Sequence, residues 1–342
     1  MIEKCISNTK VLLLGFSVTE DRLGYAHVAK KLLLVSHPEI DLYICGVGGI
    51  TPQPLSVLFE HVDKQHGPFS HVFLEISTSA HSKYTLHSVE RDVLDVAYDL
   101  FRKIQTTGAE VSLINLYRKD FDYEYHYFDM LLESLSARFQ IPLLDLGNKL
   151  LAERGREALA PFLKDYVHTT EAGADFQGRE AARFIGEVVT SGARNKKTPL
   201  PRTTISSLSV ISQVTNASQY WYKRGGIELT AASIDEGNEI EILIPDGYSV
   251  CGISFLSGPR SGKLGLRFDS AEMETIISTY DEYCYYERFN YRWFNSHFSG
   301  KSVAVRQISG TPDVELRKGS VDSRPRIGRI FDIYLAGQSF SG

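Results

Sequence analysis

The stretch KVLLLGFSVTE, Lys10 to Glu20, decides the fold class of the first half of the chain. Its four consecutive aliphatic residues, Val11 to Leu14, are typical of a strand buried on both faces, as in a parallel sheet covered by helices. The run stops at Gly15, Phe16 and Ser17, where the strand reaches its carboxyl end. Open α/β sheets place their sites beyond the carboxyl ends of the strands. Gly-Phe-Ser is therefore either a plain turn or a turn that presents a nucleophile.

Strand-like apolar runs alternate with helix-like segments as far as residue 192, which predicts a flavodoxin-like, doubly wound parallel sheet with helices on both faces. The predicted strands cover Val11–Leu14, Leu42–Cys45, His71–Ile76, Val111–Leu116 and Ile141–Leu146. The predicted helices carry apolar residues at three- and four-residue spacing, and cover Tyr25–Leu34, Leu55–Val62, Val89–Ile104, Tyr127–Phe139 and Arg179–Val189. We expect one α/β domain over residues 1–192.

The character of the sequence changes after residue 192. Residues 193–205 are polar and basic with two prolines, and this composition predicts an exposed linker. From residue 206 to 342, short alternating runs such as NEIEILIP and KSVAVRQI are separated by turn residues. This pattern is typical of an antiparallel sandwich. We expect a second, all-β domain of jelly-roll-like type.

Composition excludes several functional classes. The chain has 342 residues, of which 43% are hydrophobic, and it is long enough for two cores. A net charge of −5 provides no basic stripe, so nucleic acid is not an expected partner. The N-terminus lacks the pattern of a signal peptide, and no run reaches the roughly 18 apolar residues of a membrane-spanning helix. We expect a cytoplasmic protein without a membrane span.

Cysteine and histidine spacing gives no sign of a metal. Cys5, Cys45, Cys251 and Cys284 form no C-x-x-C pair, which argues against a zinc knuckle and a redox motif. The ten histidines also lack metal-ligand spacing. We therefore expect reduced, mostly buried thiols and predict no metal site.

A short motif, Asp165-Tyr-Val-His168, precedes the last predicted helix of the α/β domain. The three-residue step allows Asp165 to orient the His168 ring while the other ring nitrogen faces a nucleophile. Ser17 is the only obvious candidate for that nucleophile. Taken alone, D-x-x-H is common and usually marks two solvated polar residues.

Four blocks, in order, resemble those of the GDSL-type or SGNH hydrolases and acyltransferases. They are LLLGFS, CGVGGIT, VFLEISTS and DYVHTTEAG, and the resemblance covers about residues 10–190. It implies that Ser17 is the nucleophile, that His168 is its general base and that Asp165 orients the imidazole. It also implies the SGNH hydrolase fold and no cofactor.

The same resemblance implies an oxyanion hole and shows two departures from the family pattern. Gly49 falls on the oxyanion-hole glycine, whose N–H would act with that of Ser17, although a glycine cluster there also fits a flexible loop. Phe16 stands where the family usually has Asp, and Ser79 stands at the position of an Asn donor. A serine hydroxyl is a shorter donor, and the loss of one such donor costs on the order of 10²-fold in rate. Nearby substitutes for that donor are Ser77, Thr78 and His81, although a surface position is the favoured reading of His81.

The second domain contains an aromatic stretch, YDEYCYYERFNYRWF, from Tyr280 to Phe294. Such a stretch provides either rings that stack on a sugar or ordinary sandwich core. Tyr285 and Tyr286 are adjacent and cannot both face the core of one strand, so they are the candidate saccharide-binding residues. Trp293 alternates with Tyr291 and is expected in the core.

Two functions from different classes follow. The first is a serine esterase or acyltransferase that acts on a short acyl ester, acetyl in particular, of a small molecule or saccharide through an acyl-enzyme. The second is a degenerate SGNH-like protein that serves as a saccharide-binding or structural module. The residues do not distinguish hydrolysis from transfer, and they leave the oligomeric state open.

Overall fold

The chain forms two compact units in a computed structural model that describes residues 8–79, 90–119, 127–215, 217–269, 273–310 and 312–338. The first unit comprises Met1–Leu200 together with Gly225–Ile227, and the second comprises Pro201–Arg224 and Glu228–Gly342. Within the described residues, no helix is both long enough and apolar enough to cross a membrane.

A five-stranded parallel sheet forms the centre of the first unit. Its strands are β1 (Thr9–Gly15), β2 (Ile40–Gly46), β3 (His71–Glu75), β4 (Glu110–Asn115) and β5 (Leu143–Asp145), in the spatial order β2-β1-β3-β4-β5. This is the flavodoxin-like order of a doubly wound sheet. The four aliphatic side chains of β1, Val11 to Leu14, are fully buried, as expected of a strand covered on both faces. The predicted fold class is confirmed.

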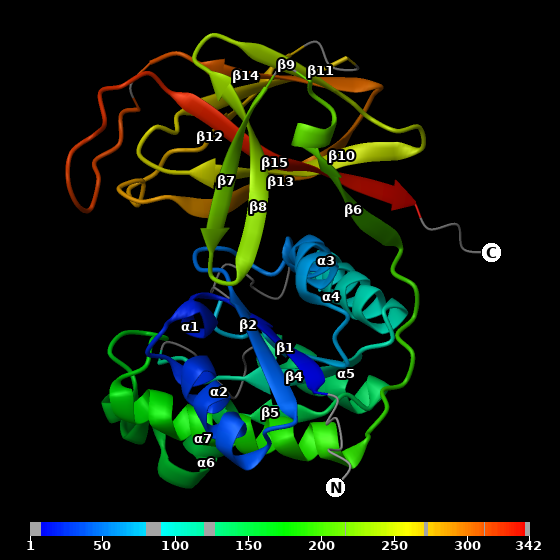
Figure 1. Ribbon diagram of the computed structural model, residues 1–342, viewed down its shortest axis with the longest axis vertical. Coiled ribbons are helices and arrows are strands. Elements are labelled where there is room, and N and C mark those ends of the chain that lie inside the picture. The colour runs from blue at the N-terminus through cyan, green and yellow to red at the C-terminus, as the bar shows by residue number, and fades with distance from the viewer. Residues whose placement is uncertain are drawn as a thin grey trace, which may run out of the picture. The chain divides into compact units, whose positions relative to one another are not determined.

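Helices cover both faces of this sheet. They are α1 (Ser17–Glu20), α2 (Tyr25–Ser36), α3 (Leu55–His66), α4 (Glu90–Thr106), α5 (Tyr127–Phe139), α6 (Leu146–Arg154), the 3₁₀ helix η1 (Arg156–Phe162) and α7 (Glu171–Ser191). Helices α2 and α7 pack together on one side of the sheet, and α3 and α4 on the other (Figure 1). The sequence did not predict α1, α6 or η1.

Helix α7 begins eight residues before the predicted start at Arg179. The Thr170 side chain caps it by accepting a hydrogen bond from the Gly173 N–H at 3.2 Å. A Cβ at Gly173 would lie 2.1 Å from the carbonyl oxygen of Phe162, so this turn of the helix requires glycine. Glycine usually weakens a helix, which is why the pattern alone placed the start later.

The segment predicted as an exposed linker, residues 193–205, is exposed at most positions and also makes specific contacts. Arg194 pairs with Glu110 at 2.9 Å, the Lys196 N–H donates to a carbonyl of α5, and Thr198 is buried. Strand β6 begins at Thr203. Composition could not predict these contacts, because polar residues can form hydrogen bonds with solvent or with other parts of the chain.

The second unit consists of two antiparallel sheets. Its strands are β6 (Thr203–Ser209), β7 (Ser218–Arg224), β8 (Ile227–Asp235), β9 (Glu239–Leu243), β10 (Tyr248–Ser257), β11 (Lys263–Phe268), β12 (Thr275–Ser278), β13 (Arg288–Ser299), β14 (Ser302–Ile308) and β15 (Ile327–Gln338), with the 3₁₀ helix η2 (Val210–Ser212). One sheet has the order β13-β10-β15-β8-β7, with β6 also paired to β15, and the other has the order β12-β11-β14-β9.

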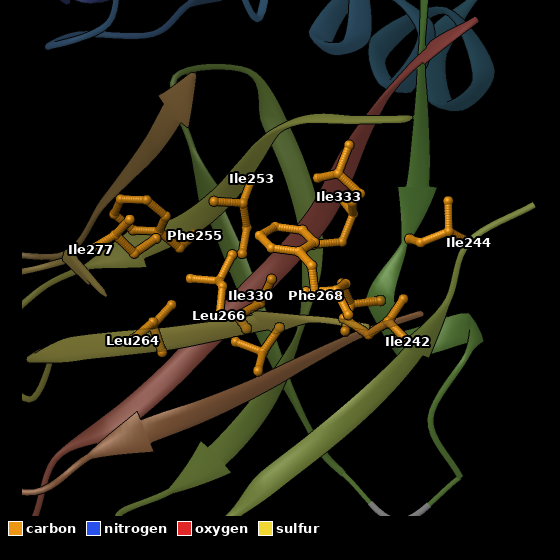
Figure 2. Close-up of a cluster of buried hydrophobic side chains, with 14 of the residues drawn as sticks. Ile242, Ile244, Ile253, Phe255, Leu264, Leu266, Phe268, Ile277, Ile330 and Ile333 are labelled. Atoms are coloured by element: carbon orange, nitrogen blue, oxygen red, sulfur yellow. The ribbon is translucent and has the colours of Figure 1, made fainter. Parts of the chain in front are cut away.

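Both sheets contribute side chains to one hydrophobic core (Figure 2). Phe255 and Ile333 come from the larger sheet, while Leu266, Phe268 and Val303 come from the smaller one. All five are 2% exposed or less. Two sheets that share a core in this way form a sandwich, which confirms the predicted all-β second domain.

Candidate active site

The turn that follows β1 places Ser17 at the start of α1. The wholly buried ring of Phe16 packs into the core, and Ser17 is half-buried. A Cβ at Gly15 would lie 2.2 Å from Thr19 Oγ1, so the short helix can fold back against the strand end only because residue 15 is glycine.

The segment from Asp165 to His168 forms a compact turn before α7. The Lys164 N–H donates to the His168 carbonyl at 2.9 Å, and Leu163 bridges to Thr169. Within the turn, Asp165 Oδ1 accepts the backbone N–H groups of Val167 at 2.9 Å and His168 at 2.7 Å. The aspartate thus fixes the shape of the turn that carries the histidine.

The structure brings Ser17, Asp165 and His168 into one hydrogen-bonded chain. His168 Nδ1 lies 2.9 Å from Asp165 Oδ2, and His168 Nε2 lies 3.1 Å from Ser17 Oγ. Serine and histidine are 151 residues apart in the sequence. Both distances lie within hydrogen-bond reach, the geometry that a base needs to remove the serine proton.

Contacts with neighbouring segments hold the Asp165–His168 turn against helix α1. Lys164 Nζ lies 3.3 Å from Asp21 Oδ2, at the C-terminal end of α1. The Lys119 N–H, after β4, donates to the Tyr166 carbonyl at 2.9 Å. These two contacts anchor the turn on both sides.

The pKa of Asp165 is below its ordinary value. Burial alone would raise this pKa, but the N–H groups of Val167 and His168 and the His168 ring stabilise the ionised form and outweigh the effect of burial. Asp165 is therefore a carboxylate at neutral pH, which favours the imidazole tautomer that carries its proton on Nδ1.

The glycine loop after β2 lies beside Ser17. A Cβ at Gly48 would be 3.3 Å from the Ser17 Cβ, and the Gly48 N–H donates to Glu20 Oε2 at 3.0 Å. Gly49 has a φ of +80°, which favours glycine. Among the described residues, no acceptor binds the N–H of either Gly49 or Ser17. These two amides are free in the way that an oxyanion hole requires, whereas the Gly48 amide is occupied.

The turn after β3 positions Ser79, which is 8% exposed. The hydroxyls of Ser77 and Thr78, two of the three proposed substitute donors, both donate to Glu75. They are therefore directed at that carboxylate and are unavailable to an oxyanion. His81 lies outside the described residues.

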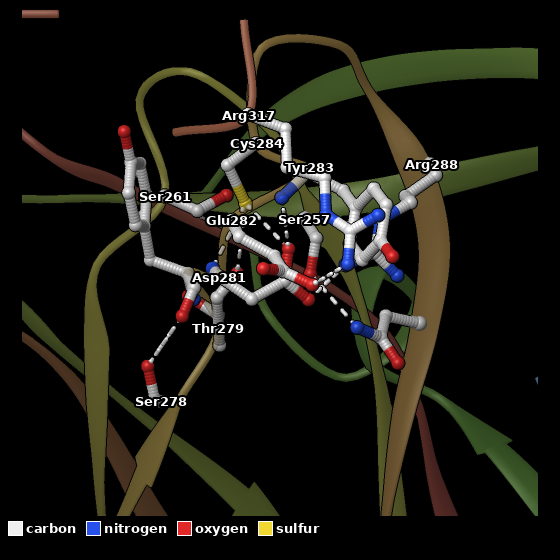
Figure 3. Close-up of polar contacts among 12 residues, drawn as sticks. Ser257, Ser261, Ser278, Thr279, Asp281, Glu282, Tyr283, Cys284, Arg288 and Arg317 are labelled. Carbon is white, nitrogen blue, oxygen red and sulfur yellow. Dashed lines mark hydrogen bonds and ion pairs between the residues drawn. The ribbon is translucent and has the colours of Figure 1, made fainter. Parts of the chain in front are cut away.

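The aromatic stretch of the second unit begins with a turn rather than with a strand. Residues 281–287 precede β13, and two acidic side chains of this turn pair with arginines: Glu282 with Arg317 at 2.9 Å, and Asp281 with Arg288 (Figure 3). The assumption that Tyr285 and Tyr286 alternate within a strand is therefore wrong.

The two tyrosine rings are half-buried and lie 5.0 Å apart between their centroids. Lys318 Nζ lies 5.7 Å from the Tyr285 centroid, and Arg224 Cζ lies 4.7 Å from the Tyr286 centroid. A cation over each ring occupies surface that a sugar would need. Trp221, on β7, is 72% exposed, and the sequence analysis did not single it out.

Two acidic residues next to the site were also missed. Glu20 binds the Gly48 amide, and Glu75 binds the turn before Ser79. A signal was present for Glu75, because a carboxylate interrupts the otherwise apolar run VFLEI. Among the described residues, no group of three or more His, Cys, Asp or Glu side chains could hold a metal ion.

No family model matches the sequence, and no curated protein matches it either. Solved structures do resemble it. The crystal structure of a two-domain esterase (CEX) active on acetylated mannans has a TM-score of 0.66 at 16% identity, and the match covers 97% of this chain and 91% of that one. The same esterase co-crystallized with mannopentaose gives a TM-score of 0.65 at 16% identity, covering 98% of this chain and 92% of that one.

A catalytic mutant of Axe2, an acetylxylan esterase from Geobacillus stearothermophilus, matches 53% of this chain and 95% of its own, with a TM-score of 0.43 and 19% identity. The long match to the two-domain esterase shows the class of fold, a doubly wound α/β domain followed by a β-sandwich. The two-domain fold expected from the sequence is thus confirmed.

Proposed function

We propose that the protein is a serine esterase that removes a short acyl group, acetyl in particular, from a saccharide. The observation that carries this proposal is the hydrogen-bonded chain from Asp165 through His168 to Ser17, with distances of 2.9 and 3.1 Å. A nucleophile, a base and an orienting carboxylate in this order support acyl transfer through serine.

In the proposed mechanism, Ser17 Oγ attacks the ester carbonyl while His168 Nε2 takes the hydroxyl proton. The free N–H groups of Ser17 and Gly49, with the Ser79 hydroxyl, stabilise the tetrahedral oxyanion. Collapse of this intermediate breaks the C–O bond to the alcohol, which leaves with the proton from His168. Water then attacks the acyl-enzyme as His168 takes its proton, and releases the acid and free Ser17. An acceptor hydroxyl in place of water would give transfer.

A saccharide substrate is proposed because the solved structure that matches both units of this chain is that of an esterase active on a polysaccharide. The two-domain esterase that matches both units of this chain is active on acetylated mannans. Acetylated mannan is therefore the first polysaccharide to test on this protein. The exposed Trp221 also favours a second function, saccharide binding by the second unit, because a flat exposed ring can cover the apolar face of a sugar.

Turnover of p-nitrophenyl acetate tests the proposed function. We expect hydrolysis by the wild type and a loss of at least about 10³-fold in Ser17→Ala, followed by acetate release from acetylated mannan. No turnover above buffer, in a protein that is folded by circular dichroism, would overturn the esterase proposal. Mannan-oligosaccharide binding that Trp221→Ala abolishes in such an inactive protein would instead support the binding module.

A further inference from the structure

Glu75, the last residue of β3, carries a wholly buried carboxylate in the centre of the first unit. Its strand lies in the middle of the sheet, between β1 and β4. Burial raises the pKa of Glu75, and a carboxylate in such a place persists only where hydrogen-bond donors compensate for its lost hydration.

Four residues provide these donors. Glu75 Oε1 accepts from Ser77 Oγ at 3.2 Å and from the Thr78 N–H at 2.9 Å. Glu75 Oε2 accepts from Thr78 Oγ1 at 2.9 Å and from Thr19 Oγ1 at 3.3 Å. The backbone amide of Phe16 also stabilises the ionised form. The acceptor capacity of the carboxylate is therefore largely filled.

These donors come from two separate parts of the proposed site. Thr19 lies in the nucleophile helix α1, two residues after Ser17, whereas Ser77 and Thr78 come directly before Ser79. The Thr19 hydroxyl donates its one proton to Glu75. The Tyr25 hydroxyl, 3.0 Å away, is therefore the donor in its hydrogen bond with Thr19. One buried network thus joins α2, α1 and the turn after β3.

The network also explains the glycine before the nucleophile turn. A Cβ at Gly15 would lie 2.2 Å from Thr19 Oγ1 and 3.1 Å from the Glu75 Cβ. Glycine is needed there because the hydroxyl and the glutamate side chain fill that space. The absence of an acidic residue at Phe16 therefore does not leave the turn without a carboxylate, since Glu75 supplies one from the neighbouring strand.

We propose that Glu75 is a positioning residue for the esterase reaction, which fixes the nucleophile helix relative to the Ser77–Ser79 turn and so sets the geometry of the oxyanion hole. The inference rests on the proposed function. Glu75 acts through Thr19 and Thr78 and does not itself touch the reacting atoms.

Glu75→Gln tests this role, because the amide keeps the shape but turns one acceptor oxygen into a donor. We expect kcat on p-nitrophenyl acetate to fall about 10²-fold, the cost of a small misplacement of reacting groups, with KM changed by less than about twofold. Thr19→Val should lower kcat in the same direction. The double variant should lose about as much as Glu75→Gln alone, since both changes break one network.

Asp99→Asn is the matched control. Asp99 is a second buried carboxylate of the first unit, 1% exposed on α4 and 3.4 Å from Lys103. The Asp99→Asn variant should be less stable than the wild type but should keep kcat within about twofold of the wild-type value. An unchanged kcat in Glu75→Gln, with Ser17→Ala inactive, would overturn the role of Glu75 and leave the proposed function intact.

Amide hydrogen exchange tests the same inference without any activity. In Glu75→Gln, residues 16–20 and 76–79 should exchange at least about tenfold faster than in the wild type, and in Asp99→Asn they should not, because only the first change releases both segments. This measurement holds even if the wild type proves inactive. Unchanged exchange in both segments would overturn the inference.

Discussion

At the scale of single residues, one exposed carboxylate and one partly exposed imidazole define the proposed site. The Asp165 side chain is 49% exposed, yet it makes three hydrogen bonds within its own turn. Its proposed role is thus to hold the His168 ring at a fixed angle. Solvent shares in stabilising the imidazolium, because the His168 side chain is 31% exposed.

Asp165→Asn should therefore reduce activity less than the loss of either partner. We expect kcat on p-nitrophenyl acetate to fall about 10²- to 10⁴-fold, against a larger fall in Ser17→Ala and His168→Ala. Steady-state kinetics on the three variants provide the comparison. A loss in Asp165→Asn as large as that in Ser17→Ala would show that the aspartate does more than orient the ring.

Ser79→Asn should preserve or raise kcat on a small ester. The longer amide restores a donor of the family's length about where negative charge develops, and the neighbouring hydroxyls of Ser77 and Thr78 cannot take its place because Glu75 binds them. Kinetics and circular dichroism on the variant test this expectation. A clear fall in kcat with the fold intact would mean that the surroundings of residue 79 are shaped around serine.

At the scale of elements, hydrophobic periodicity predicted the parallel strands and the longer helices. It missed the short helix and the turn that depend on tertiary contacts. All five parallel strands lie within two residues of their predicted starts, because each apolar run is short and alternates with a longer helix-like segment. The four-residue helix α1 is too short to show a period. The turn at 281–287 was read as a strand because its aromatic residues have high strand propensity, whereas ion pairs with Arg288 and Arg317 shape it.

Replacing each of the two tryptophans of the chain should affect stability differently, because one is half-buried in the sandwich and the other is exposed. Trp293 is half-buried on β13, 6.0 Å between ring centroids from the wholly buried Tyr334. Trp293→Ala should cost about 2 kcal/mol, roughly half the value for a fully buried tryptophan, and Trp221→Ala should cost less than about 0.5 kcal/mol. Thermal denaturation of both variants measures the difference. Equal melting temperatures would contradict these assigned environments.

The Cys45 thiol, near the carboxyl end of β2, should not react with alkylating reagents in the folded state. Cys45 is fully buried, and burial together with the nearby Glu20 raises the pKa of its thiol to about 12. The thiolate is the reactive form, so iodoacetamide at pH 8 should leave Cys45 unmodified until the protein is unfolded in urea. Peptide mass mapping with and without urea checks this. Rapid native alkylation would show that the strand end opens.

At the scale of the whole molecule, composition and a change of period predicted two units of the right classes. The candidate site was assembled from four blocks. The structure places CGVGGIT and DYVHTTEAG beside Ser17 of the first block, and Glu75 of the third block binds Thr19. The sequence could flag Glu75 but could not predict its partners, because the hydrogen bond from Thr19 to Glu75 spans 56 residues. The pattern of a single sequence does not reveal hydrogen-bond partners that are so far apart along the chain.

The proposed function depends on Ser17 being a nucleophile that His168 activates. Labelling with a fluorophosphonate probe, followed by peptide mass spectrometry, tests it most directly, because the probe forms a stable bond only with an activated serine. We predict a single adduct on the peptide that contains Ser17, strongly reduced in His168→Ala and absent in Ser17→Ala. An unlabelled wild type beside a reactive control esterase, or an adduct on another serine, would show that Ser17 is not the activated nucleophile.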